Sequence, residues 1–203
     1  MNRIGTICLT LVLLSVATYS PVAKQRTYQT KCNLTEANSP NIRGIHLGMT
    51  TQQVLAFFPG KSERENIDEA LEFAKKRGQD TVVLGFEPES QSSKDRFKGI
   101  GSLSATLHKG RVVDFSVAYY GVTWTTIDDW IAKLSEAYRL PGAQEWAAGP
   151  DETPNKVLSC NGFEIEAAIQ GAGASIRVRD TGFAREAGER TSSEDRKRRE
   201  FKP

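Results

Sequence analysis

Residue types that commonly catalyse reactions or bind metals are scarce in this chain of 203 residues, which has two histidines and three cysteines. Neither His46 nor His108 has a partner His or Cys at the spacing of zinc ligands. Gly99 and Gly101 form a G-x-G pattern without the third glycine and the following helix of a dinucleotide-binding loop. The sequence therefore predicts no metal site, no cofactor and no catalytic residues, and we expect a protein that is not an enzyme.

Two carboxylates provide an alternative interpretation. Glu89 and Asp95 lie in a polar stretch, residues 88–95, that we expect to be a loop. A small secreted hydrolase could use such loop carboxylates as general acid and base, provided that they converge in one pocket. If the two side chains lie apart on a solvated loop, the hydrolase interpretation loses its support.

The N-terminus has the features of an export signal. Arg3 supplies a positive charge, residues 4–16 are an apolar run of 13 residues, and Ser15-Val16-Ala17 resembles a cleavage site. A membrane-spanning helix needs about 20 apolar residues. We expect residues 1–23 to be a signal peptide, so that the mature protein is periplasmic or secreted and has no stable membrane span. The alternative is an uncleaved anchor that extends to Val22.

Two cysteines, Cys32 and Cys160, lie outside the leader. An even number of cysteines in an exported chain favours a disulfide. The bond would tie the start of the folded body to a late strand. Two separate free thiols are the alternative.

The charges divide the chain into parts. Residues 24–182 carry 19 basic and 20 acidic side chains, and residues 183–203 carry seven basic and five acidic ones. A nearly neutral body lacks the basic surface of a nucleic-acid-binding protein, so we expect no nucleic-acid partner. Residues 183–203 have almost no apolar residues to bury. We expect a disordered tail or a frayed helix there, although its basic cluster could instead act as a surface tether.

We predict that residues 24–182 form one α+β domain. Helices are predicted over about 51–58, 63–77 and 126–139, from capping residues and apolar positions on one face. Each helical region is followed by alternating strands, which gives the order α-α-β-β-β-α-β-β-β. Consecutive hairpins predict an antiparallel sheet with helices on one face. The repeated layout predicts two similar halves, residues 41–121 and 122–182.

Two hairpin turns can be assigned from the sequence. Asn161-Gly162 predicts a two-residue turn that pairs Cys160 with Phe163 and directs both side chains to the same face. For the hairpin around Lys109 and Gly110 we expect a three-residue loop, residues 108–110. A two-residue loop would place polar residues opposite apolar ones, because one step of register exchanges the faces.

Four aromatic residues are candidates for a partner-binding surface, because they lie on expected loops or at the end of a strand: Phe97, Tyr120, Trp124 and Trp146. Exposed Tyr and Trp side chains are enriched in protein interfaces. The alternative is that these rings cover a second small core beneath the loops.

Residues 42–50, Ile-Arg-Gly-Ile-His-Leu-Gly-Met-Thr, followed by Val54 and Pro59-Gly60, resemble a known opening motif. The motif is similar to the start of exported modules of the SmpA/OmlA (BamE) type, which belong to outer-membrane barrel assembly, and of the β-lactamase-inhibitor-protein-like fold. The resemblance covers about 18 residues and implies a helix–loop–helix packed on an antiparallel sheet. Those families bind other proteins. The shared residues form a helix cap and a turn, so no functional residue is implied.

These features together predict a non-catalytic exported protein that binds another exported or envelope protein, or associates with the envelope. The small secreted hydrolase is the alternative.

Overall fold

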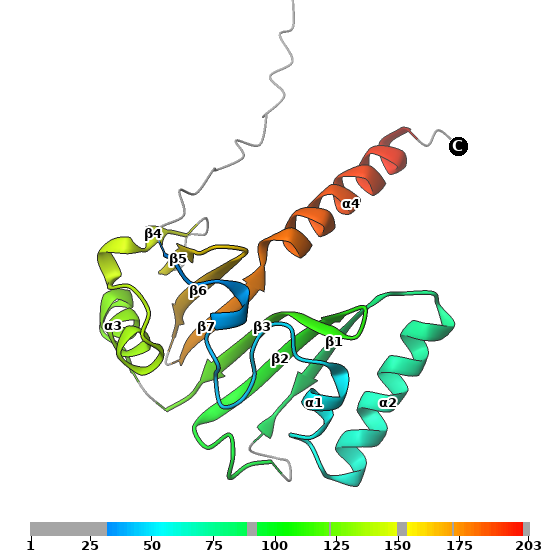
Figure 1. Cartoon of the computed structure of the whole chain (residues 1–203), viewed down its shortest axis with the longest axis horizontal. Coiled ribbons are helices and arrows are strands. Elements are labelled where there is room, and N and C mark those ends of the chain that lie inside the picture. Colours follow the sequence, from blue (N-terminus) through cyan, green and yellow to red (C-terminus); the bar gives the residue numbers. More distant parts are fainter. Residues whose placement is uncertain (1–31, 89–92, 122, 150–153, 172, 201–203) are drawn as a thin grey trace, which may run out of the picture.

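The fold is α+β, as the sequence predicts, and contains one antiparallel sheet of seven strands in the order β1-β2-β3-β7-β6-β5-β4 (Figure 1). The computed structural model describes residues 32–88, 93–121, 123–149, 154–171 and 173–200. The strands are β1 (Thr81–Phe86), β2 (Ile100–His108), β3 (Arg111–Tyr119), β4 (Ala147–Ala148), β5 (Asn155–Ser159), β6 (Phe163–Gln170) and β7 (Gly173–Asp180). The helices are α1 (Thr51–Leu55), α2 (Lys61–Lys76), α3 (Ile127–Tyr138) and α4 (Thr181–Glu200), with short 3-10 helices η1 (Glu36–Asn38) and η3 (Ala143–Glu145).

The sheet is built from two meanders, β1-β2-β3 and β5-β6-β7, whose last strands β3 and β7 pair at its centre. Helix α2 precedes the first meander and α3 precedes the second. Val117 lies opposite Ile176 in the central pair, which joins the apolar sides of both meanders into one surface. The signal peptide predicted for residues 1–23 lies outside the described residues, as do residues 24–31.

One face of the sheet, which we call the inner face, is covered by α1, α2, α3 and residues 32–50. Strand side chains alternate, so every second residue of β2, β6 and β7 is buried on this face. The capping box predicted at the start of α1 is present, because Thr50 Oγ1 accepts from the Gln53 amide and the Gln53 side chain accepts from Thr50 N. Helix α1 is shorter than predicted and ends at Leu55. Packing against the sheet rather than helix length must therefore hold it in place.

A disulfide joins Cys32 to Cys160, with 4.8 Å between their Cα atoms. Next to it, the Asn161 amide donates to the Leu34 carbonyl at 3.0 Å. Both cysteines are buried. The bond holds the first described residues against the β5–β6 turn. From there the chain crosses the inner face to α1 (Figure 1).

The β5–β6 hairpin confirms the predicted Asn161-Gly162 turn, because the Cys160 amide donates to the Phe163 carbonyl at 2.9 Å. The prediction for the β2–β3 hairpin is wrong. Its turn has two residues, Lys109 and Gly110, both with positive φ, as a type I′ turn requires. A register shift between Thr106 and Leu107 then brings apolar residues opposite one another. The extra residue, Val113, forms a β-bulge. The bulge, and not a longer loop, places the apolar residues of the two strands opposite one another.

Of the two alternatives expected for the tail, a disordered segment and a frayed helix, the structure has the helix, α4 over Thr181–Glu200. Asp180 Oδ1 accepts from the Phe183 amide at 2.9 Å and satisfies one of the first helical N–H groups. The Phe183 ring lies 5.3 Å from the His108 ring, and the rest of α4 extends away from the sheet (Figure 1). The helix has almost no apolar face, but it is rich in residues that favour helix and begins at a capped strand end.

No helix in the described part of the chain is long and apolar enough to cross a membrane.

Candidate binding surface

The second face of the sheet, which we call the outer face, carries polar side chains and has no helix packed across it in the described residues. Its side chains occupy alternate positions of the central strands, and all except the buried Asp114 are at least partly exposed. They are Ser102, Ser104, Thr106, Asp114, Ser116, Glu164, Glu166, Ser175, Arg177 and Arg179. An antiparallel sheet with one apolar and one polar face is the expected result of this alternation.

Asp114 is the centre of an ion-pair network on this face. Arg177 Nε donates to Asp114 Oδ1 at 2.9 Å, and Arg177 Nη2 donates to Oδ2, so the guanidinium is held bidentately. Arg179 approaches the same carboxylate at 3.4 Å through Nε and contacts Glu164 at 3.4 Å through Nη1. Its Nε lies within ion-pair distance but has no hydrogen-bond geometry. The hydrogen bonds that Arg177 donates to Asp114 raise the pKa of Arg177.

The polar groups on both sides of the network are also paired. Ser104 Oγ and Ser116 Oγ lie 2.9 Å apart on β2 and β3. Asn155 Nδ2 donates to Glu166 Oε1 at 3.0 Å between β5 and β6. The outer face is therefore a preformed surface whose side chains are fixed by cross-strand contacts before any partner binds.

Replacing Asp114 by Asn should lower the free energy of unfolding by about 2 kcal/mol. The side chain is 8% exposed and forms ion pairs with two guanidinium groups, and breaking a fully buried pair costs about 3–5 kcal/mol. The expected loss is smaller here because the Arg177 side chain is 45% exposed and water screens its charge. Urea denaturation measures the difference. Ser104→Ala, which removes a neutral hydrogen bond on the same face, is the control and should cost no more than about 1 kcal/mol. Equal stability of the Asp114 variant and the wild type would contradict the role of the network.

Tyr120 lies at one end of the outer face and is 58% exposed. Its ring lies flat against the backbone of Gly101, where a Cβ atom would come within 1.7 Å of a ring carbon. Gly101 is also the position of a register shift in β2. A glycine at this bulge is therefore what allows the ring to lie on the sheet and still present its edge to solvent.

The other three predicted surface aromatics do not form a surface with Tyr120. Phe97 is 0% exposed and Trp146 is 5% exposed, so the prediction that they line a binding surface is wrong. Trp146 donates its indole N–H to the Pro141 carbonyl at 3.0 Å. Trp124 is partly buried and lies 5.1 Å from the Trp130 ring. Phe97, Trp146 and Trp124 therefore fit the alternative interpretation, in which the rings cover the core beneath the loops.

Tyr119, the neighbour of Tyr120 in sequence, points to the inner face. Its ring lies 5.2 Å from the Trp130 ring, and its hydroxyl lies 3.4 Å from that of Tyr138. Burial, together with the contact to Tyr138, raises the pKa of Tyr119. Successive residues of a strand end thus separate into a core tyrosine and a surface tyrosine.

A shallow depression of about 430 Å³ lies on the outer face between β1, β2 and β3. Three hydroxyls line it, those of Ser102, Ser104 and Ser116, together with Gly85. These groups can donate and accept hydrogen bonds from a partner's backbone or side chains.

The loop carboxylates of the hydrolase interpretation do not form a site in the described residues. Asp95 is exposed and lines none of the five clefts that we compared. Glu89 lies outside the described residues. Within the described part of the chain, no group of three or more His, Cys, Asp or Glu residues could hold a metal ion.

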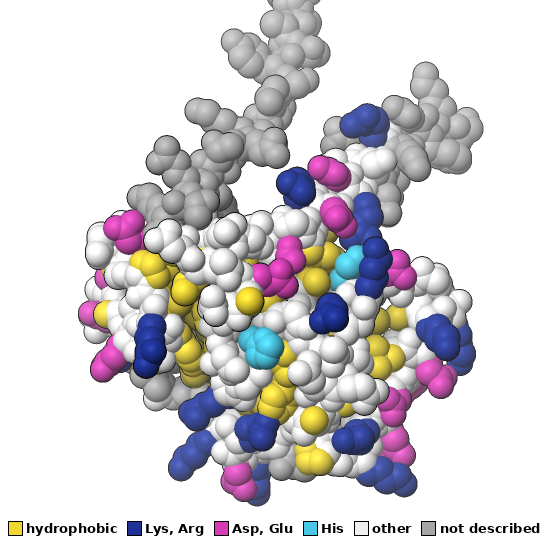
Figure 2. Space-filling model, viewed as in Figure 1, with side chains coloured by type: hydrophobic (Ala, Val, Ile, Leu, Met, Phe, Trp, Pro, Cys, Tyr) yellow, Lys and Arg dark blue, Asp and Glu magenta, His cyan; other side chains and the backbone are white. Residues whose placement is uncertain are grey.

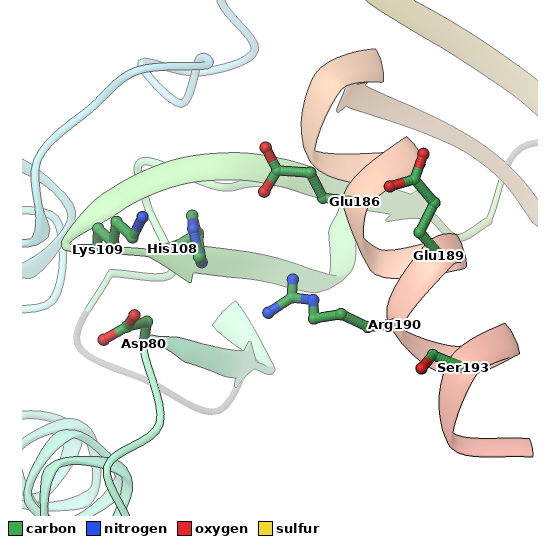
Figure 3. A pocket seen from close by; sticks show the side chains of 7 residues that line it. All are labelled: Asp80, His108, Lys109, Glu186, Glu189, Arg190 and Ser193. Atoms are coloured by element: carbon green, nitrogen blue, oxygen red, sulfur yellow. The ribbon is translucent and has the colours of Figure 1, made fainter. Parts of the chain in front are cut away.

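A cleft of about 410 Å³ separates α4 from the β2–β3 turn, and Figure 3 shows the side chains that line it. His108 Nδ1 lies 2.9 Å from Thr81 Oγ1, so one ring nitrogen is already occupied. Glu186 and Arg190 point from α4 toward the turn (Figure 3). Among the described residues, no ion pair or hydrogen bond joins α4 to His108, Lys109 or Asp80. The cleft is therefore an open gap beside a projecting helix.

Sequence reasoning missed the ion-pair network, although its signal is present. Strand β6 begins Phe-Glu-Ile-Glu and β7 ends Ile-Arg-Val-Arg-Asp, so Glu164 and Glu166 alternate in β6 as Arg177 and Arg179 do in β7. The observed register sets Glu164 opposite Arg179 and Glu166 opposite Arg177. Charge pairing across the hairpin could have predicted both pairs. Comparisons of the chain with protein-family models, curated proteins and solved structures give no match.

Proposed function

We propose that this protein is an exported, non-catalytic binding module that contacts a partner protein through the outer face of its sheet. The observation that carries the proposal is the uncovered face with a preformed network around Asp114. The disulfide between Cys32 and Cys160 is compatible with an oxidising compartment, and the leader predicted at residues 1–23 would deliver the chain there. The resemblance of residues 42–60 to exported modules that bind proteins supports the same function.

The chemistry of the face supports one class of partner. Arg177 is half exposed although it is paired with Asp114, so it can also donate a hydrogen bond to a partner carboxylate. The Tyr120 ring adds an apolar contact at the end of the face. Side chains that are already fixed lose little conformational entropy on binding, which favours a specific interface. We therefore expect a folded exported or envelope partner with an acidic group opposite Arg177.

Site-specific photocrosslinking tests this function. A photoreactive amino acid at Ser104, on the outer face, should form crosslinks to an envelope protein when the exported protein is irradiated in cells. The same amino acid at Glu136, on the exposed side of α3, is the matched control and should not. Arg177→Glu and Tyr120→Ala should each reduce the crosslinks from position 104. Crosslinks of equal intensity from both positions, or crosslinks unchanged by both substitutions, would count against the proposal.

A further inference from the structure

The two edge strands of the sheet, β4 and β1, differ in length and in how well they are protected from pairing with another chain. At one edge, β4 has only two residues. At the other edge, β1 has six, Thr-Val-Val-Leu-Gly-Phe, and pairs along its whole length with β2, which is its only neighbour among the described strands. Proteins commonly protect an edge strand with Lys, Pro or a bulge, because an open edge can pair with another chain. Strand β1 contains none of these, and Val83 is 67% exposed.

The register of β1 fixes which backbone groups are open. The Lys109 amide donates to the Asp80 carbonyl at 2.8 Å, so the pair of residues 80 and 109 is a hydrogen-bonded pair. In an antiparallel ladder the pairs alternate, so the next pair, Thr81 with His108, is not hydrogen-bonded. Thr81, Val83 and Gly85 therefore direct their N–H and C=O groups away from β2. No hydrogen bond from the described part of the chain reaches these groups.

Helix α2 forms a wall beside this open edge. Two clefts, of about 540 and 110 Å³, run between α2 and β1 and share Asn66, Ala70 and Val83. Phe73 lines the larger cleft and is 54% exposed, although its ring is apolar. Figure 2 shows apolar atoms between α2 and the sheet. The edge thus combines open backbone groups with an apolar surface, which are the two components of strand addition.

The charged side chains that line the two clefts are acidic, and one basic side chain lies beside them. Glu69 lines the larger cleft and Glu63 the smaller, and among the described residues no Lys, Arg or His lines either. The Arg77 guanidinium lies over the Phe73 ring, 4.4 Å from its centroid. Glu63 accepts from the Gly60 amide at 3.0 Å and so caps its own helix. Glu69 is exposed and has no ion-pair partner among the described residues. A basic side chain would therefore complement the groove, and a second acidic one would be repelled.

We propose that the groove between β1 and α2 binds an extended, basic peptide segment of another protein, which adds to the sheet as a strand beside β1. The backbone of the segment pairs with Thr81, Val83 and Gly85. Its alternate side chains contact Phe73 on the α2 side, and a Lys or Arg reaches Glu69. A second copy of this chain fits less well, because its β1 strand has no Lys or Arg that could reach Glu69. The groove shares Gly85 with the outer-face depression, but α2 and the open edge of β1 form it, so the inference does not depend on the function proposed above.

A phage-displayed library of random 12-residue peptides provides the probe. Peptides selected on the full mature protein should alternate apolar and basic residues. Val83→Pro should weaken their binding at least about tenfold, because it removes one outward N–H and one strand hydrogen bond. The N–H of Val83 is not part of the β1–β2 ladder, so the variant should keep its fold, as proline on an edge strand does. Val83→Thr, which keeps the N–H, is the matched control and should bind within about threefold of the wild type.

Two further arms separate strand addition from other binding modes. Two methylated forms of a selected peptide should be compared. Methylation of every second backbone nitrogen should abolish binding when those nitrogens face β1. Methylation of the intervening nitrogens, which face away from β1, should leave binding intact. Glu69→Lys should weaken binding of the basic peptides at least about fivefold, with no effect on urea denaturation. Selection of peptides that bind Val83→Pro as well as the wild type, or failure to select any peptide, would overturn the proposal. A dimer that forms in the wild type and is lost in Val83→Pro would also overturn it, because the edge would then belong to a second copy.

Discussion

Reduction of the disulfide between Cys32 and Cys160 should lower the free energy of unfolding by about 5 kcal/mol. The bond joins residues 128 positions apart, and the chain-entropy model assigns a loop of that length about this stabilisation. Reduction should also weaken the packing of the segment that crosses the inner face, because that segment begins at Cys32. Ile42, Ile45 and Leu47 of that segment are all buried in the core. Their removal from the sheet would expose apolar surface, so the reduced protein should unfold at lower urea concentration.

Urea denaturation of the full mature chain with and without reductant measures the effect. The double variant Cys32→Ala/Cys160→Ala is the control, because reductant should not change its stability. Peptide mapping without reductant should recover one linked peptide that contains both cysteines. Two separate peptides, each alkylated without reductant, would show that the thiols are free. A stability difference below about 1 kcal/mol between oxidised and reduced protein would likewise contradict the expected effect.

Local signals in the sequence predicted most of the architecture. The predicted capping box of Thr50 and Gln53 begins α1. The start of α3 was predicted from Asp128 and Asp129, and the structure adds a capping box between Thr126 and Asp129. The Asn161-Gly162 turn sets the register of the β5–β6 hairpin. Each signal involves residues within four positions of one another. Physical rules about caps and turns therefore suffice to locate these elements without any knowledge of tertiary contacts.

The bulges escaped prediction because they depend on contacts between distant residues. A turn assignment for Lys109 and Gly110 assumes that the ladder continues without interruption, and Val113 interrupts it. Gly101 likewise looks like a flexible residue in the sequence. Its role becomes visible only when the Tyr120 ring is placed against it. Register in a sheet is fixed by the buried face as a whole, so a single hairpin does not determine it.

The candidate site could be predicted only in part. Tyr120 was identified because alternation in β3 separates it from Tyr119. Asp114, Arg177 and Arg179 were not, because individual charges on a strand are ordinary surface residues until the register sets them opposite one another. The β1 edge could not be recognised from sequence at all, since strand order decides which strand is left without a partner. Topology thus defines both surfaces that we propose for binding.

Phe97→Ala should lower the free energy of unfolding by about 3–4 kcal/mol and leave the outer face intact. The Phe97 ring is fully buried, lies 5.7 Å from the Phe58 ring and 6.2 Å from the Phe57 ring, and its truncation leaves a cavity. Tyr120→Ala removes a ring that is more than half exposed, so it should cost about 1 kcal/mol or less.

Binding should show the opposite order. At a temperature where both variants are folded, Phe97→Ala should keep the photocrosslinks from position 104, and Tyr120→Ala should lose most of them. Urea denaturation and crosslinking of the same two preparations give both readouts. A Phe97→Ala protein with the stability of the wild type and no crosslinks would place Phe97 on the binding surface after all. The two variants therefore distinguish Phe97, whose ring stabilises the core, from Tyr120, whose ring we expect to contact the partner.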